Sequence, residues 1–197
     1  TTLAALPQGV VGGTTGSGLF TFSGSSWSPD VNGIDPFASV LTLRTVGSTL
    51  YAGLLQGLFE RKANGAWSDV SDGLPPFTTV AALGGDDATA FAALNFGGVY
   101  RRDKGQSWLS DATGASSASF TSLDVSAGRL VAGASTGGVL MKRDGGWGSE
   151  NAGLPAGADV TVVCVDVPGC EGGAILATAE GGTIIFFSMA TSFSAAA

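Results

Sequence analysis

The sequence predicts an all-β fold, a five-bladed β-propeller made of four-stranded repeats of about 40 residues, and three observations support it. A tryptophan recurs every 39 to 41 residues: Trp27, Trp67, Trp108 and Trp147. A glycine that opens one apolar segment of each repeat keeps a similar spacing: Gly18, Gly57, Gly98, Gly138 and Gly182. The apolar segments are short and bounded by Gly, Asp, Asn, Ser or Pro, so the turns are too frequent for helices.

The second repeat shows the order of the elements most clearly. Its four expected strands are "SVLTLRTV" at 39–46, "LYAGL" at 50–54, "GLFERK" at 57–62 and "NGAWSDV" at 64–70, followed by the linker "DGLPPF" at 72–77. In a propeller blade the first strand lines the central channel and the fourth forms the outer edge. We expect the small residues of each second strand to let neighbouring blades approach closely, and each tryptophan to pack over its blade at the start of the outer strand.

The repeats extend over approximately 1–36, 37–77, 78–117, 118–157 and 158–197, which we interpret as one propeller domain. The last repeat is truncated, and its tryptophan position is best matched by Phe193. A five-bladed propeller with a shortened last blade is favoured, because an open array would expose two apolar blade faces. The alternative is that the chain is part of a larger propeller.

Charge and hydropathy exclude several classes of partner. The chain has 9 basic and 16 acidic residues and a net charge of -7, which disfavours binding to nucleic acid or to an anionic membrane surface. No apolar run approaches the roughly 20 residues needed to span a bilayer.

The chain begins at Thr1 without a methionine, which fits either an exported product after removal of its signal or a trimmed chain. We therefore expect an extracytoplasmic protein, periplasmic or secreted.

Two cysteines, Cys164 and Cys170, lie six positions apart around a Pro-Gly turn. They can form a disulfide across a hairpin in an oxidising compartment, or remain one buried and one free thiol. The chain has no histidine and no CxxC spacing, so no zinc site, redox site or cofactor is expected.

The turns before the tryptophans resemble the Asp-box, whose pattern is Ser/Thr-x-Asp-x-Gly-x-Thr-Trp. "RRDKGQSW" supplies Asp103, Gly105, Ser107 and Trp108, while Arg101 replaces the opening hydroxyl residue. The shorter "KRDGGW" retains Asp144, Gly145 and Trp147, "KANGAW" retains Gly65 and Trp67, and "SGSSW" retains Trp27 alone.

This resemblance extends over the whole chain and is to the Asp-box (BNR) propellers, a group that includes sialidase-like, sortilin-like and photosystem II assembly factor-like proteins. It implies a structural role for Asp103 and Asp144: the aspartate accepts backbone N–H bonds, the glycine adopts a positive φ, and the tryptophan packs beneath. In that family the Asp-box lies on the face away from the usual active site.

Catalysis is not expected from the residues present. A sialidase would need an arginine cluster, a Tyr-Glu nucleophile pair and an acid aspartate. The tyrosines, Tyr51 and Tyr100, stand at apolar positions of the repeat, and the arginines are scattered. A Ser/His/Asp triad is impossible without histidine.

The search for a binding site therefore moves to the face formed by the loops between second and third strands and by the linkers between repeats. Acidic or amide residues recur in the linkers: Asp30, Asn32, Asp69, Asp72, Asp111, Glu150 and Asn151. This set could hold a basic partner, a cation or sugar hydroxyls, or could be solvated. Variable residues follow the second strands: Gln56, Asn95, Phe96, Ser135, Thr136 and Glu180. Phe96 is the first candidate for a ligand contact.

The favoured function is a non-catalytic interaction module, an accessory or scaffold subunit that binds another protein in an exported or envelope-associated assembly. The alternatives are a carbohydrate-binding lectin and a degenerate, sialidase-like glycoside hydrolase. A lectin would repeat the same residues in each blade, yet the positions equivalent to "NF" carry "LQ", "ST" and "AE". That divergence favours a protein partner.

Overall fold

The computed structural model describes residues 1–62, 65–126, 129–135, 137–152, 154, 157, 159–160, 174–179 and 183–188. The chain separates into two compact units. The first contains Thr1–Ala92 and Tyr100–Ser110, and the second contains Ala93–Val99 and Asp111–Ala197. The interpretation as one domain stays a prediction, and each unit is described by itself below.

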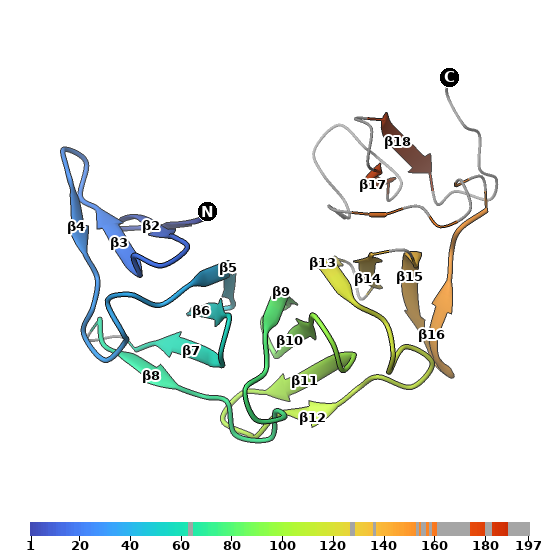
Figure 1. Ribbon diagram of the computed structural model, residues 1–197, viewed down its shortest axis with the longest axis horizontal. Helices are drawn as coiled ribbons and strands as arrows, with labels where there is room; N and C mark the ends of the chain where they lie inside the picture. Colours follow the sequence, from blue (N-terminus) through green and yellow to red (C-terminus); the bar gives the residue numbers. More distant parts are fainter. Residues whose placement is uncertain are drawn as a thin grey trace. The chain divides into compact units, whose positions relative to one another are not determined.

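Two four-stranded antiparallel sheets form most of the first unit (Figure 1). The first sheet contains β1 (Thr2–Leu6), β2 (Gly9–Gly13), β3 (Leu19–Phe22) and β4 (Trp27–Pro29). The second contains β5 (Val40–Val46), β6 (Thr49–Leu54), β7 (Leu58–Arg61) and β8 (Trp67–Asp69). In both sheets the strands pair in chain order, which is the meander expected of a propeller blade.

The third sheet contains β9 (Val80–Gly85), β10 (Thr89–Leu94), β11 (Val99–Asp103) and β12 (Leu109–Ser110). The fourth contains β13 (Phe120–Ser126), β14 (Arg129–Ala134), β15 (Gly138–Arg143) and β16 (Gly146–Ser149). The strands β17 (Ala174–Ala179) and β18 (Thr183–Ser188) form a separate antiparallel pair. The all-β class with four-stranded repeats is thereby confirmed. The expected first strand of the last repeat, Phe193 and both cysteines lie outside the described residues.

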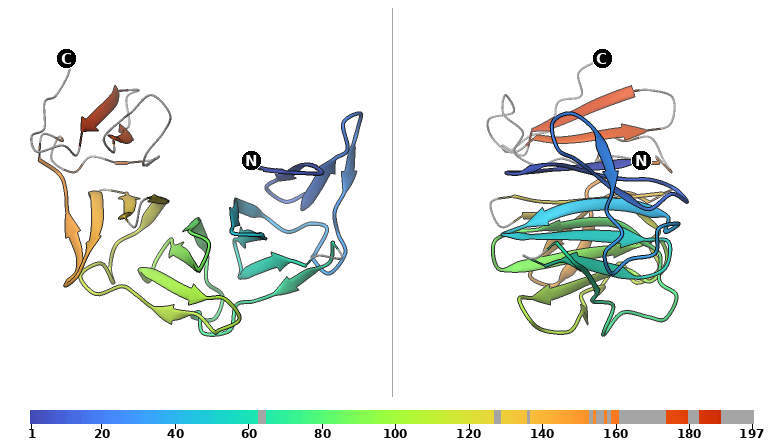
Figure 2. Two further views of the ribbon diagram at one scale, coloured as in Figure 1. Left: turned by 180° about the vertical axis from the view of Figure 1, so that it is seen from behind. Right: turned by 90° about the vertical axis from the view of Figure 1, so that its left-hand side faces the viewer.

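Small residues in the second strand allow consecutive sheets to pack closely. Within the first unit β5 contacts both β1 and β9, an arrangement that can be followed in Figure 2. A Cβ atom added to Gly53 of β6 would lie 2.6 Å from a methyl group of Val80 in β9, and one added to Gly13 of β2 would lie 2.6 Å from Val40 in β5. Any larger residue at these positions would push the neighbouring strand away.

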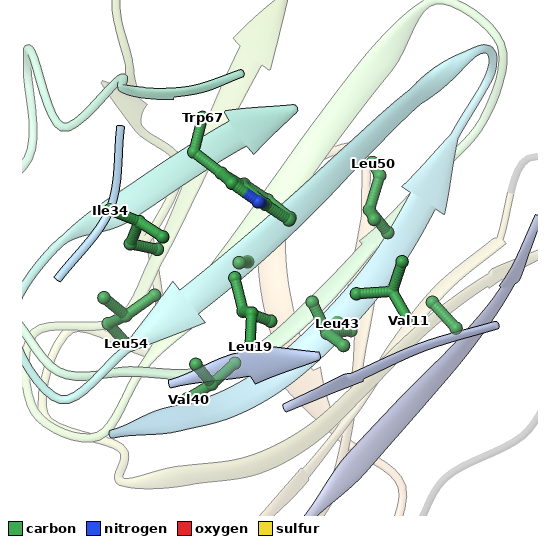
Figure 3. Packing of buried hydrophobic residues seen from close by; sticks show 10 residues of the cluster. Val11, Leu19, Ile34, Val40, Leu43, Leu50, Leu54 and Trp67 are labelled. Atoms are coloured by element: carbon green, nitrogen blue, oxygen red, sulfur yellow. The ribbon is translucent and has the colours of Figure 1, made fainter. Parts of the chain in front are cut away.

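The apolar core of the first unit fills the space between the first two sheets (Figure 3). Val11 and Leu19 from the first sheet pack with Val40 and Leu43 from β5, and Trp67 of β8 belongs to the same cluster. In β6 the members of the cluster, Leu50, Ala52 and Leu54, alternate along the strand, as a half-buried β-sheet requires. In β5 Val40 and Leu43 are three positions apart, because the pairing with β6 shifts register between Val40 and Thr42.

Three of the four tryptophans dock on the linker that follows the preceding sheet. The indole Nε1 of Trp67 donates to Asp30 Oδ1 at 3.2 Å, that of Trp108 to the Val70 carbonyl at 2.8 Å, and that of Trp147 to the Asp111 carbonyl at 2.8 Å. Their backbone amides donate to the carbonyls two residues further along the same linkers, those of Asn32, Asp72 and Thr113. The tryptophan therefore joins consecutive repeats, in addition to packing over its own.

Trp27 differs from the other three. It packs on Phe22 with ring centroids 5.2 Å apart, and 48% of its surface remains exposed. The expectation that every tryptophan is buried over its blade is thus wrong for the first repeat. The physical reason is that burial in the other repeats depends on a preceding linker, and β4 has no counterpart to Asp30 or Val70 before it among the described residues.

Candidate functional site

Hydrogen bonds hold the loop between β6 and β7 against two linkers of the first unit. The Leu55 amide donates to the Ser39 carbonyl at 3.0 Å, and the Thr79 hydroxyl donates to the Leu55 carbonyl at 2.9 Å. The Gly57 amide donates to the Thr78 carbonyl at 2.9 Å. The β6–β7 loop and the two linkers thus share one face, as the sequence predicts.

Large apolar side chains project from this face into solvent. Phe37 in the first linker is 76% exposed, Leu55 in the loop 51%, and Phe77 in the second linker 86%. We define the aromatic face as Phe37, Leu55, Gln56 and Phe77. Contiguous exposed apolar surface of this kind is typical of a site that contacts a partner.

Two cavities lie along the aromatic face. One has a volume of about 310 Å³ and is lined by Phe37, Leu55 and Gln56 among others. The other has about 350 Å³ and is lined by Phe77, Gln56 and the two prolines before Phe77. Gln56 lines both, so the cavities are neighbours. Both cavities combine apolar lining residues with a few polar ones, Asp35 and Ser39 in the first and Asp69, Ser71 and Thr78 in the second, which suits an apolar side chain of a ligand flanked by polar groups.

Phe77 has a left-handed backbone, with φ at +56°, and it is the one non-glycine residue with positive φ in the described part of the chain. This conformation costs a residue with a Cβ atom about 1 kcal/mol. The buried Thr78 and the hydrogen bond from Gly57 to its carbonyl hold the segment in place. The structure therefore fixes an aromatic ring in solvent at an energetic cost.

The same position in a later repeat carries glycine. The linkers "GLPPFTTV" at 73–80 and "GLPAGADV" at 153–160 align without a gap, and Phe77 corresponds to Gly157. Gly157 has φ at +72°. Glycine adopts this conformation freely, so the backbone of the repeat does not require a phenylalanine here.

Sequence reasoning missed Phe37 and Phe77. The available signal was a Pro-Phe dipeptide at equivalent positions of two linkers, 40 residues apart. The sequence analysis places these linkers on the candidate face but singles out only their acidic and amide residues, because a Pro-containing segment between strands is usually a turn. Only the exposure of the rings distinguishes them from packing residues.

Several predicted ligand carboxylates are instead engaged within the protein. Asp30 is 8% exposed, pairs with Arg61 at 3.1 Å, and accepts hydrogen bonds from Trp67 and from the Thr21 hydroxyl. Asp111 pairs with Lys142, and Glu150 pairs with Arg143. These contacts give the three carboxylates a structural role, and a ligand role for them stays a prediction.

The other linker residues follow the same pattern. Asp69 Oδ1 accepts a hydrogen bond from the Ser71 amide at 2.8 Å, and Asp72 accepts one from the Ser107 hydroxyl. Asn151 accepts from the Val139 amide at 2.8 Å and donates to the Gly137 carbonyl at 2.9 Å. The carbonyl of Asn32 accepts from Trp67. These linker residues therefore make hydrogen bonds to neighbouring segments of the protein.

In the second unit, Phe96 lies in the loop between β10 and β11 and is 77% exposed. Its neighbour Asn95 accepts a hydrogen bond from the Ser119 hydroxyl at 2.8 Å, and the Ser135 amide donates to the Ser119 carbonyl at 2.9 Å. The loops of this unit are thus fastened as in the first. Thr136 and Glu180 lie outside the described residues.

The Asp-box-like turn joins β11 to β12. Gly105 has φ at +78°, and the Gln106 amide donates to the Asp103 carbonyl at 3.0 Å. The Asp103 carboxylate accepts from the Thr89 hydroxyl at 2.9 Å, on the adjacent strand β10. Asp144 and Gly145 form the two-residue turn between Arg143 and Gly146.

A polar cluster in the first unit was not anticipated. Tyr51 of β6 lies opposite Glu60 of β7, and the Arg102 guanidinium pairs with Glu60 at 2.9 Å. Burial raises the pKa of Tyr51, an effect that Arg102 partly offsets and Glu60 reinforces. A nucleophile is activated by an adjacent general base or by a lowered pKa; the pKa of Tyr51 is shifted upward, so in this cluster only the Glu60 carboxylate could have that role.

In the part of the chain that the structure describes, no three His, Cys, Asp or Glu side chains are grouped so as to hold a metal ion. Likewise, the described residues contain no helix of sufficient length and apolar character to cross a membrane.

No protein-family model matches the chain, and no curated protein matches it. Solved structures do. The extracellular domain of BT3049 from B. thetaiotaomicron, described as a hybrid two-component system, is 16% identical over 99% of this chain and 27% of its own, with a TM-score of 0.77. YCF48 bound to D1 peptide is 12% identical over 98% of this chain and 65% of its own, with a TM-score of 0.66.

The computationally designed protein Ika8 is 17% identical over 96% of this chain and 58% of its own, with a TM-score of 0.67. The chain therefore spans between about a quarter and two thirds of the length of these structures. At such identities the similarity shows the fold alone, that of a β-propeller.

Proposed function

We propose that this chain is a non-catalytic β-propeller interaction module that binds another protein through the aromatic face. The observation that carries the proposal is the conformation of Phe77, whose side chain is 86% exposed and whose backbone is left-handed. Gly157, at the equivalent position of a later repeat, has the same backbone conformation. A strained and exposed aromatic residue is unfavourable for folding alone. Partner binding supplies the burial that the free chain lacks.

The partner is an extended protein segment with two apolar side chains, one for each cavity. Aromatic rings beside the cavities would cover those side chains, and Gln56 between them can hydrogen-bond the segment's backbone. Exposed Asp35 and Asp69 also line the cavities. In a chain of net charge -7 they favour lysine or arginine beside the apolar anchors.

The solved structures supply a precedent for this class of function. YCF48 was solved with a bound D1 peptide, and the BT3049 structure is that of an extracellular domain. By analogy of fold we propose that this chain acts outside the cytoplasm, as an accessory or scaffold subunit of an assembly. The Tyr51 side chain is only 7% exposed, which supports the non-catalytic part of the proposal over a degenerate glycosidase.

A lectin is the second candidate, and one observation favours it. Phe37 and Phe77 occupy equivalent positions of consecutive repeats, as sugar-stacking residues of a repeated site would. The loops between the second and third strands of consecutive repeats differ, however, with "LQ" at 55–56 in one repeat and "NF" at 95–96 in the next. A protein segment explains a pair of unequal cavities better than two copies of one sugar site.

The test is selection of ligands against the purified chain. A peptide display library and a glycan array are screened with the wild type, with Phe77→Gly and with Leu109→Ser, which changes an exposed apolar residue on β12 away from the aromatic face. We expect peptides with apolar and cationic residues that bind the wild type and the Leu109 variant and fail to bind the Phe77 variant. Peptides that bind all three equally, or glycans as the sole ligands, would overturn the proposal.

A further inference from the structure

A third cavity, of about 450 Å³, lies in the first unit at the ends of the strands opposite the aromatic face. It is lined by the turns that join β1 to β2, β5 to β6, β7 to β8 and β11 to β12. In an antiparallel meander these turns lie at the other end of the strands from the β6–β7 loop. The cavity is therefore separate from the proposed partner site.

The charges at this cavity do not cancel. Arg61 is compensated by Asp30 at 3.1 Å, and Glu60 by Arg102 at 2.9 Å. Lys62 and Lys104, which are exposed, also line the cavity, and no described residue provides either ammonium group with an ion pair. Two unpaired positive charges thus face one cavity in a protein of net charge -7.

Arg61 also lines the cavity, and its charge is already compensated. Its Nε is buried and has no hydrogen-bond acceptor among the described residues, although its terminal nitrogen binds Asp30. A buried donor without an acceptor is costly, about 1 to 3 kcal/mol, and more for a charged group. That nitrogen is inaccessible to a ligand, so an oxyanion in the cavity would act on the two lysines, to which it brings counter-charge.

The remaining lining groups are those that bind hydroxylated molecules. Gln8 and Ser48, which are exposed, and Thr49 supply an amide and two hydroxyl groups, and Leu6 adds an apolar surface. Side-chain amides and hydroxyls donate and accept, as sugar hydroxyls do. We propose that this cavity binds an acidic sugar, with Lys62 and Lys104 holding the carboxylate or phosphate and the polar residues holding the ring hydroxyls.

The experiment measures binding of three probes to the folded chain by calorimetry and by NMR: glucuronate, glucose 6-phosphate and glucose. They share the sugar ring and differ in their acid group. Lys62→Gln and Lys104→Gln are compared with Arg101→Gln, which removes the same charge from an exposed position on β11 outside the cavity. All variants are exposed substitutions, and circular dichroism checks that they fold.

We expect glucuronate, glucose 6-phosphate or both to bind, and glucose to bind much more weakly. Each lysine variant should weaken binding roughly tenfold, the effect of one charge-assisted hydrogen bond, and Arg101→Gln should leave it unchanged. The amides that shift should belong to the four turns that line the cavity. Binding of glucose as strong as that of the acids, equal loss in the Arg101 variant, or no binding of either acid would overturn the proposal.

The result is distinguishable from the test of the aromatic face. Phe77→Gly lies at the opposite strand ends and should leave acidic sugar binding unchanged, whereas Lys62→Gln should leave peptide binding unchanged. Either site can therefore fail without the other.

Discussion

Phe77 and Gly157 occupy the same position of their repeats and share a left-handed backbone, with φ at +56° and +72°. Phe37, at the equivalent position of the preceding repeat, does not have a positive φ, so the conformation is shared by these two linkers and not by every repeat. Glycine meets it without strain, and phenylalanine does not. The backbone conformation of the linker is therefore compatible with glycine, and the phenylalanine side chain is needed only for the aromatic face.

Replacing Phe77 with glycine should leave the free energy of unfolding unchanged or raise it by up to about 1 kcal/mol, because relief of the strain is offset by the extra freedom of glycine in the unfolded chain. The lost side chain is exposed and contributes little burial. Phe77→Ala, which keeps the strained φ, is the matched control and should not gain stability. Urea denaturation measures both, and a loss of more than about 1 kcal/mol in the glycine variant would show that the ring supports the fold.

The tryptophans provide a test of how the repeats are joined. Trp67→Phe removes the Nε1 hydrogen bond to Asp30. It also leaves a cavity in the core, because the tryptophan side chain that it replaces is only 3% exposed. We expect a loss of about 2 to 4 kcal/mol. Trp27→Phe, at a side chain 48% exposed, should cost less than about 1 kcal/mol.

Thermal unfolding of the two variants side by side gives the comparison. Equal losses at both positions would mean that the indole of Trp67 contributes through its own sheet alone, and that the contact with the preceding linker is energetically neutral.

Asp30 tests whether the linker carboxylates are structural. Asp30→Asn leaves Arg61 without its counter-charge in a pair whose side chains are 7% and 17% exposed. Breaking a largely buried pair from one side should cost about 2 to 4 kcal/mol. Asp69→Asn, at an exposed carboxylate that caps a turn, should cost less than about 1 kcal/mol.

Chemical denaturation at neutral pH and moderate salt measures this difference. If Asp30→Asn folds as stably as the wild type, the ion pair is not needed, and the predicted ligand role of the linker carboxylates regains support.

Much of the architecture could be predicted from the sequence, because the signals are local and repeated. The tryptophan spacing and the alternation in "SVLTLRTV" depend on turn chemistry and on which face of a strand is buried. The four-stranded sheets follow from those signals alone. The docking of Trp67 on Asp30 does not, since it joins residues 37 positions apart in different sheets.

The candidate site was predicted less well for the same reason. The sequence could predict that the β6–β7 loop and the linkers of the first unit share one face, since strand order determines which loops share an end. It could not predict which side chains of that face are exposed, because exposure depends on tertiary packing. Phe37 and Phe77 resemble packing residues in the sequence, while Asp30 resembles a surface carboxylate and is buried against Arg61.

Tyr51 gives a prediction on pH. Burial raises the pKa of Tyr51 in the folded chain above its ordinary value of 10.0, so the folded state holds this proton more tightly than the unfolded state. The corresponding stability is fully present below pH 10 and is lost as the pH rises through the folded pKa. The difference in unfolding free energy between wild type and Tyr51→Phe should therefore be constant below pH 10 and shift against the wild type above it. The ultraviolet titration of the wild type, minus that of Tyr51→Phe, should place the ionisation of the Tyr51 phenol above pH 10. Ionisation below that value would mean that Arg102 outweighs burial, and it would give the Tyr51-Glu60-Arg102 cluster the activated phenol that a glycosidase needs.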